Sequence, residues 1–197
     1  MSDILLLSGG IDSAALAAWY RPDLCITVDY GQRAAAAEAS AAKSICEALA
    51  LRHENFEIPV PQLGAGDMSA GFPCRHSQHS EFWPFRNQFL VTLAAMRAIQ
   101  CHCGRILIGS VSTDVRHVDG RKEFIEQLGN LLEIQEGGLR LMAPAISMTS
   151  LELVQASGIP MEVLAWSHSC HLSDLACGSC KGCIKHSEIM APLGYDR

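Results

Sequence analysis

Short apolar runs alternate along the chain with longer segments of helical character. The runs 3–7, 24–29 and 105–108 are mainly apolar and of strand length, which is typical of parallel strands buried on both faces. Composition and the spacing of apolar residues predict helices at 14–20, 34–51, 87–100, 123–134 and 150–156. Strands that alternate with helices in this way predict an α/β fold with a doubly wound parallel sheet.

Two segments depart from this alternation. Residues 59–83 are rich in proline, glycine and polar residues, which predicts a long surface loop. The tail from Ser167 onward is rich in cysteine, and we expect little regular structure there.

Composition narrows the class of protein. Hydrophobic residues make up 49% and charged residues 18% of the 197 residues, as expected of a folded domain rather than a disordered chain. No apolar run approaches the roughly 20 residues that span a bilayer, and no signal peptide is evident, so we expect a cytoplasmic protein without a membrane partner. The net charge of −6, without a basic block, argues against binding to a long nucleic acid.

The segment Ser8-Gly9-Gly10-Ile11-Asp12-Ser13 carries the first chemical signal, because it lies between the first strand and the first helix. Two glycines allow a tight turn that brings backbone N–H groups close to an anion at the helix N-terminus. Ser8 and Ser13 add hydroxyl donors, and Asp12 suits Mg²⁺. A glycine turn with a helix cap is the plainer alternative, but the whole string after a buried strand favours a phosphate site.

Four cysteines near the C-terminus carry the second signal. Cys170, Cys177, Cys180 and Cys183 have the short spacing of a closed, structural Zn²⁺ site. An iron–sulfur cluster or a redox pair uses similar spacings. The expected organisation is therefore a nucleotide-binding domain over residues 1–166 and a zinc-binding segment over residues 167–197.

The string at 8–13 matches the SGGxDS signature of PP-loop ATP pyrophosphatases. That resemblance implies an adenine nucleotide α-hydrolase-like fold and cleavage of ATP to AMP and pyrophosphate. Further stretches match the 7-cyano-7-deazaguanine synthase family of queuosine biosynthesis: Tyr30-Gly31-Gln32-Arg33 with Glu38, Arg86-Asn87, Asp114, Asp119-x-Arg121 with Phe124, and Ser169-Cys170 with the cysteine tail. The chain thus resembles that family almost from end to end.

The resemblance implies a ligase that uses ATP, Mg²⁺ and Zn²⁺ to adenylate 7-carboxy-7-deazaguanine and pass it to ammonia, giving an amide and then a nitrile. It also implies site residues. Phosphates are expected on Ser8, Gly9, Gly10, Asp12 and Ser13, and catalytic roles fall to Asp12, Arg33, Arg86 and Arg121. The substrate is expected to contact Tyr30, Gln32, Arg33, Glu38, Arg86, Asn87, Asp114 and Asp119. Family members are commonly homodimers.

Several positions depart from the family pattern. A Lys-x-Glu expected before the helix near residue 150 is replaced by Ser147-Met148-Thr149, an expected arginine is His186, and a glycine is Phe85. These departures keep open a specialised homologue that stops at the amide or transfers the acyl group to an amine on a partner protein. A tRNA thiolase and a regulatory nucleotide-binding subunit are further alternatives.

Overall fold

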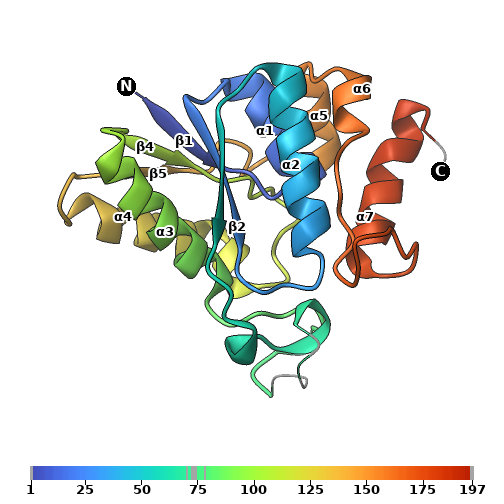
Figure 1. The fold of residues 1–197 in the computed structure, drawn as a ribbon, viewed down its shortest axis with the longest axis horizontal. Coiled ribbons are helices and arrows are strands. Elements are labelled where there is room, and N and C mark those ends of the chain that lie inside the picture. The colour runs from blue at the N-terminus through green and yellow to red at the C-terminus, as the bar shows by residue number, and fades with distance from the viewer. Residues whose placement is uncertain (1, 70, 72–74, 78, 196–197) are drawn as a thin grey trace.

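Five strands form one sheet in the computed structural model, which describes residues 2–69, 71, 75–77 and 79–195 (Figure 1). Every adjacent pair is parallel, and the strand order is β3-β2-β1-β4-β5. The strands are β1 (Asp3–Leu6), β2 (Leu24–Asp29), β3 (His53–Glu57), β4 (Arg105–Leu107) and β5 (Arg140–Met142). Because the winding reverses between β1 and β4, the sheet is doubly wound, as the sequence predicted.

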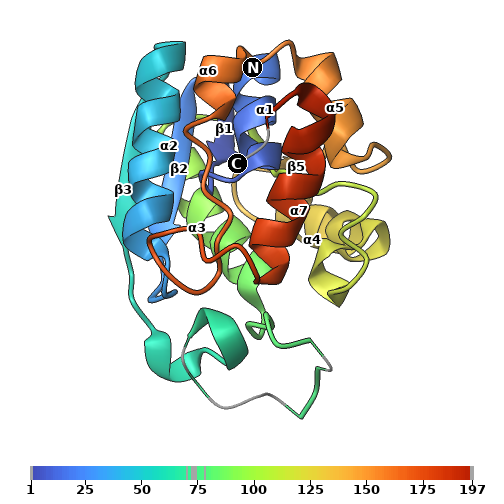
Figure 2. The same ribbon diagram turned by 90° about the vertical axis from the view of Figure 1, so that its right-hand side faces the viewer.

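Helices cover both faces of this sheet, so the molecule has three layers (Figures 1 and 2). One face carries α1, α2 and α5, and the other carries α3 and α4. The helices are α1 (Ile11–Tyr20), α2 (Ala35–Leu49), α3 (Arg86–Gln100), α4 (Lys122–Glu133), α5 (Ser150–Ser157), α6 (Met161–Leu164) and α7 (Lys181–Met190). Short 3₁₀ helices are η1 (Pro61–Leu63), η2 (Gly66–Met68), η3 (Val118–Gly120) and η4 (Ala191–Leu193).

The first strand shows why the residues that follow Asp3 are all apolar. Leu5 and Leu7 pack with α1, α2 and α5, whereas Ile4 and Leu6 pack on the opposite face with α3 and α4. Side chains alternate between the faces of a strand, and here both faces are covered. The run after Asp3 therefore lies at the centre of the core and fixes where the turn at residues 8–13 begins.

The elements that the sequence did not predict lie at the edges and in the tail. The strands β3 and β5 are the two edge strands, and α6 is a single turn of helix. The expectation of little regular structure after Ser167 was wrong, because α7 occupies ten residues of that tail. In contrast, the described parts of 59–83 contain only η1 and η2, which fits the predicted loop. No helix in the described part of the chain is long and apolar enough to cross a bilayer.

Candidate active site

A cavity of about 310 Å³ opens at the carboxyl ends of β1 and β4. In doubly wound sheets, ligands bind at this point, where the strand order reverses. Its walls come from the turn after β1, the end of β2, the start of α3, the loop after β4 and the C-terminal segment. The volume is at the lower end of the roughly 300–1,000 Å³ typical of small-molecule sites. Position and size both favour a small ligand.

The turn after β1 is held open toward this cavity by internal hydrogen bonds. Ser13 Oγ donates to the Gly10 carbonyl over 3.0 Å, and the hydroxyls of Ser8 and Ser13 are 3.1 Å apart. Gly9 has a φ of +77°, and a Cβ there would lie 2.6 Å from the Glu38 carbonyl oxygen on α2. Glycine is therefore required at residue 9, because any side chain would push the turn away from α2.

The start of α1 gives this turn N–H groups of the kind that bind anions. The helix begins at Ile11, and its first N–H groups have no partner within the helix. Ser8, Gly10, Asp12 and Ser13 line the cavity, while Gly9 supports them from behind, with its carbonyl accepting the His168 N–H over 2.8 Å. A nucleotide phosphate fits such a cradle of glycines and helix N-terminal donors.

Lys185 on α7 was not predicted, yet it lies in the cavity opposite the turn. Its Nζ donates to Asp12 Oδ2 over 2.8 Å and to Asp114 Oδ1 over 3.2 Å. Burial by itself would lower the pKa of Lys185, but these two carboxylates raise it, so the ammonium stays charged. The other oxygen of Asp12, Oδ1, is buried without a hydrogen-bond partner among the described residues.

A second group of polar side chains lies on the α3 side of the cavity, where Tyr30, Glu38, Arg86 and Asn87 line the wall. Burial would lower the pKa of Arg86, but the neighbouring Tyr30, Asp119 and Glu38 raise it. Burial also raises the pKa of Tyr30. The guanidinium is thus a charged group that is only partly solvated, as suits recognition of a carboxylate or phosphate.

Glu38 is the most strongly perturbed carboxyl of the cavity. Burial raises its pKa to about 7, although a 2.7 Å hydrogen bond from Gln32 Nε2 and the charge of Arg86 act in the opposite direction. At neutral pH this group is close to half protonated. It can therefore donate or accept a proton at neutral pH.

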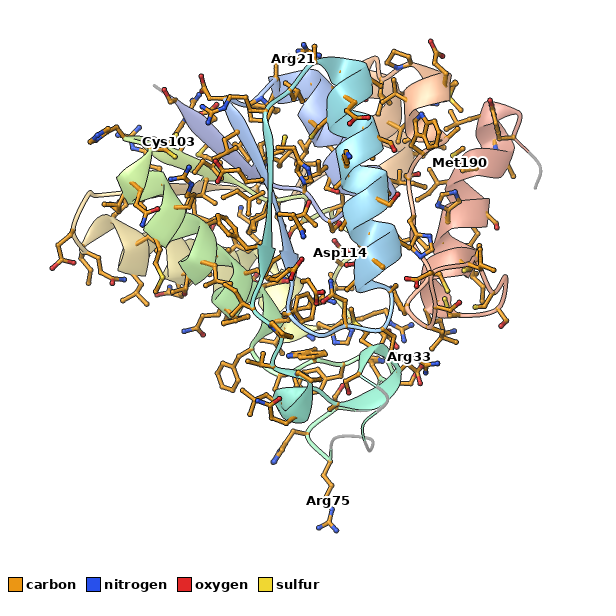
Figure 3. The ribbon with its side chains drawn as sticks, viewed as in Figure 1. Arg21, Arg33, Arg75, Cys103, Asp114 and Met190 are labelled. Atoms are coloured by element: carbon orange, nitrogen blue, oxygen red, sulfur yellow. The ribbon has the colours of Figure 1, made fainter. Side chains whose placement is uncertain are left out.

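Besides Gly9, four of the residues predicted for the nucleotide and the substrate do not line the cavity, and two of them act through residues that do. Gln32 is buried behind Glu38 and also donates to the Val28 carbonyl. Asp119 Oδ2 accepts the backbone N–H of Asn87, at the start of α3, over 3.1 Å. Arg121 donates to the Val115 carbonyl, and Arg33 is exposed. Figure 3 shows Arg33 apart from Asp114, which lies near the middle of the view.

The C-terminal segment completes the cavity and contains the cysteines. His168, Ser169 and His171 line the wall next to Lys185. Burial lowers the pKa of His171, as does the charge of Arg86, which favours a neutral imidazole. None of the three was predicted to be a site residue, since each belongs to the short stretch around Cys170 whose only visible signal was metal binding.

The four sulfurs of Cys170, Cys177, Cys180 and Cys183 lie within 4.8 Å of one another. Those of Cys177 and Cys183 are 3.9 Å apart, and those of Cys170 and Cys180 are 4.0 Å apart. A tetrahedral ion with Zn–S bonds of about 2.3 Å has sulfur–sulfur edges of about 3.8 Å. The donor set therefore fits a single zinc ion, and its tight spacing favours one ion over a multi-iron cluster.

Backbone N–H groups prepare these sulfurs for a cation. The N–H of Cys180 donates to Cys177 Sγ over 3.3 Å, and the N–H of Cys183 donates to Cys180 Sγ over 3.4 Å. Donation from Ser179 and Cys180 lowers the pKa of Cys177 to about 6. The same Cys180 sulfur caps the N-terminus of α7, so the cysteine cluster fixes the start of the helix that carries Lys185.

Comparison with known proteins gives one consistent result. The family model described as Queuosine biosynthesis protein QueC matches residues 2–191. A 7-cyano-7-deazaguanine synthase of Desulforudis audaxviator is 32% identical over 93% of this chain and 93% of its own length. One from Methanothermobacter thermautotrophicus is 29% identical over 100% of this chain and 97% of its own length. The resemblance drawn from the motifs is confirmed.

Proposed function

We propose, because this chain belongs to the QueC family of queuosine biosynthesis proteins, that it is a 7-cyano-7-deazaguanine synthase. It uses ATP to convert 7-carboxy-7-deazaguanine and ammonia into the nitrile. The observation that carries this proposal is the turn at residues 8–13, which faces the cavity at the switch point of the sheet. The relatives named above favour ammonia as the acceptor over an amine on a partner protein, and they favour a synthase over a tRNA thiolase.

The chemistry requires ATP because a carboxylate is a poor electrophile. A carboxylate oxygen attacks the α-phosphorus, pyrophosphate leaves, and ammonia then displaces AMP to give the amide. A second ATP activates the amide oxygen in the same way, and loss of AMP and of both protons from nitrogen gives the nitrile. Ser8, Gly10 and Ser13 hold the phosphates, with Gly9 shaping the turn, and Arg86 neutralises the charge that develops.

The remaining residues of the cavity bind the deazaguanine acid and move its protons. Tyr30 and Asn87 bind the substrate, Gln32 orients Glu38, and Asp119 orients Asn87 through its backbone. Glu38, with a pKa of about 7, is the residue we assign to proton transfer during amide formation and dehydration. The catalytic roles expected of Arg33 and Arg121, and the contact of Arg33 with the substrate, stay predictions, since both side chains lie outside the cavity wall.

Two metal ions belong to this proposal. Asp12 and Asp114 would hold Mg²⁺, and the unpartnered Asp12 Oδ1 supports that assignment. When bound, Mg²⁺ neutralises charge on the phosphates. The four cysteines hold a structural Zn²⁺, so that residues 167–197 form a metal-stabilised segment that closes the cavity of residues 1–166. A homodimer stays a prediction that size-exclusion chromatography with light scattering checks.

The test is mass spectrometry of the products after incubation with 7-carboxy-7-deazaguanine, ATP, Mg²⁺ and ammonium. We expect the nitrile, with AMP and pyrophosphate released. Asp12→Asn should reduce turnover by at least about 100-fold, since a charged ligand of the Mg²⁺ that would neutralise the phosphates is lost. The matched variant Glu123→Gln, which removes an exposed carboxylate on α4, should behave as wild type. Release of amide without nitrile, or no pyrophosphate at all, would contradict the proposal.

A further inference from the structure

Lys185 joins three parts of the chain that are far apart in sequence. It lies on α7, and its two partners come from the turn after β1 and from the loop after β4. Its side chain is 40% exposed, against 16% for Asp12 and 35% for Asp114, so the lysine is the least buried of the three. A lysine with this geometry has room to move, because its stem is flexible and not fully packed.

The ammonium occupies the space between the two carboxylates that are proposed to hold Mg²⁺. One cation is shared by Asp12 Oδ2 and Asp114 Oδ1, so those two oxygens can bind a second cation only if the first withdraws. An ammonium and a divalent ion at the same pair of oxygens would repel each other strongly. The arrangement is therefore one of two mutually exclusive states.

The phosphate cradle offers the displaced ammonium a new partner. Asp12 follows Gly10 by two residues and lines the same cavity, so phosphates bound on that turn would lie beside Lys185. An ammonium next to phosphate oxygens makes charge-assisted hydrogen bonds. If the ammonium moves from the carboxylates to the phosphates, the lysine is paired with anions in both states. The carboxylates are then free to bind the metal.

We propose that Lys185 exchanges partners when Mg²⁺ and nucleotide bind: it bridges Asp12 and Asp114 beforehand and contacts the phosphates of the nucleotide afterwards. This inference rests on the proposed function for the identity of the nucleotide. It assigns to the C-terminal segment a direct part in nucleotide binding, beyond holding zinc. It also assigns the anion-binding role to Lys185, next to the position where the family pattern has an arginine and this chain has His186.

The experiment measures two affinities that should change in opposite directions. In Lys185→Met, Mn²⁺ binding without nucleotide, followed by the electron paramagnetic resonance of free Mn²⁺, should become about 10-fold tighter or more, because the competing cation is gone. Binding of ATP with Mg²⁺, measured by isothermal titration calorimetry, should become about 10- to 100-fold weaker. The matched variant Lys181→Met removes an exposed lysine at the start of α7 and should change neither affinity.

The outcomes separate the proposal from a purely structural role. If Lys185→Met keeps its zinc and weakens both affinities, or leaves ATP binding unchanged, the exchange of partners is wrong. Should that variant fail to retain zinc, Lys185→Gln, which keeps polar contacts to both carboxylates, provides the same two measurements. Neither measurement includes the deazaguanine acid, so a chain that binds ATP as described but makes no nitrile would refute the proposed function and leave this inference intact.

Discussion

The free energy of unfolding of Glu38→Gln, relative to that of the wild type, should increase as pH rises. In the wild type, burial raises the Glu38 pKa from 4.5 to about 7, so the folded state binds more protons than the unfolded state between these values. Stability then falls with increasing pH, by about 1.4 kcal/mol per unit inside the window. From pH 5.5 to pH 7 the loss is on the order of 2 kcal/mol, and above pH 7 it levels off. Glutamine keeps an acceptor for Gln32 and has no proton to lose.

The assay is urea denaturation of both proteins at half-unit steps from pH 5.5 to pH 8.5, followed by circular dichroism. The quantity of interest is the free energy of unfolding of the variant minus that of the wild type, because all other titrating groups cancel in the difference. It should rise by about 2 kcal/mol up to pH 7 and then stay flat. The control is Glu47→Gln, which removes an exposed carboxylate of α2 paired with Lys43 and should change the free energy of unfolding by less than about 1 kcal/mol. A Glu38→Gln difference that is flat, or that falls with pH, would refute the burial argument.

Two further predictions concern the turn and the metal. Gly9→Ala should destabilise the protein more than Gly158→Ala, because both positions have positive φ but only Gly9 has an obstacle, the Glu38 carbonyl, 2.6 Å from the added Cβ. The left-handed backbone alone costs about 1–2 kcal/mol in each, so equal losses in urea denaturation would show that the contact with α2 contributes nothing. Removal of zinc by a chelator should lower affinity for ATP with Mg²⁺ at least about 10-fold, because α7 and Lys185 lose their anchor, and structural zinc is typically worth on the order of 10 kcal/mol. Unchanged calorimetric affinity of the chelated protein would contradict that coupling.

Strands in the middle of the sheet could be predicted from sequence because two covered faces demand apolar residues in succession. Edge strands carry no such pattern. β3 pairs only with β2, and among its residues Phe56 alone packs against the core from a partly buried position. β5 pairs only with β4, and two of its three residues are exposed. Both edge strands are hydrogen-bonded to strands that are distant in sequence. A local pattern of apolar residues contains no information about such partners.

The prediction for the tail from Ser167 onward was wrong for a different reason. The cysteine spacing correctly predicted a cluster of four sulfurs that fits one metal ion, but it was taken to exclude regular structure. In the structure the Cys180 sulfur accepts the Cys183 N–H, and so supplies the N-terminal cap that α7 needs. At an ordinary helix start, the side chain of a serine or aspartate accepts the corresponding hydrogen bond. Cysteine rarely signals a cap in sequence, so the helix that follows was missed.

The cavity shows which of its residues sequence motifs could identify and which they could not. Motifs identified residues of the turn beside the cavity, such as Gly9 and Asp12, because a tight turn after a strand requires a recognisable run of residues. No motif identifies Lys185, because a lysine two residues after a cysteine is ordinary. Its place in the cavity arises only because the fold brings α7 beside the turn after β1. The loss of an arginine at His186 therefore does not imply the loss of a cation from the site, because the neighbouring residue on the same helix directs one into the cavity. Departures from a motif are better judged by the charge that reaches the site than by the residue at the aligned position.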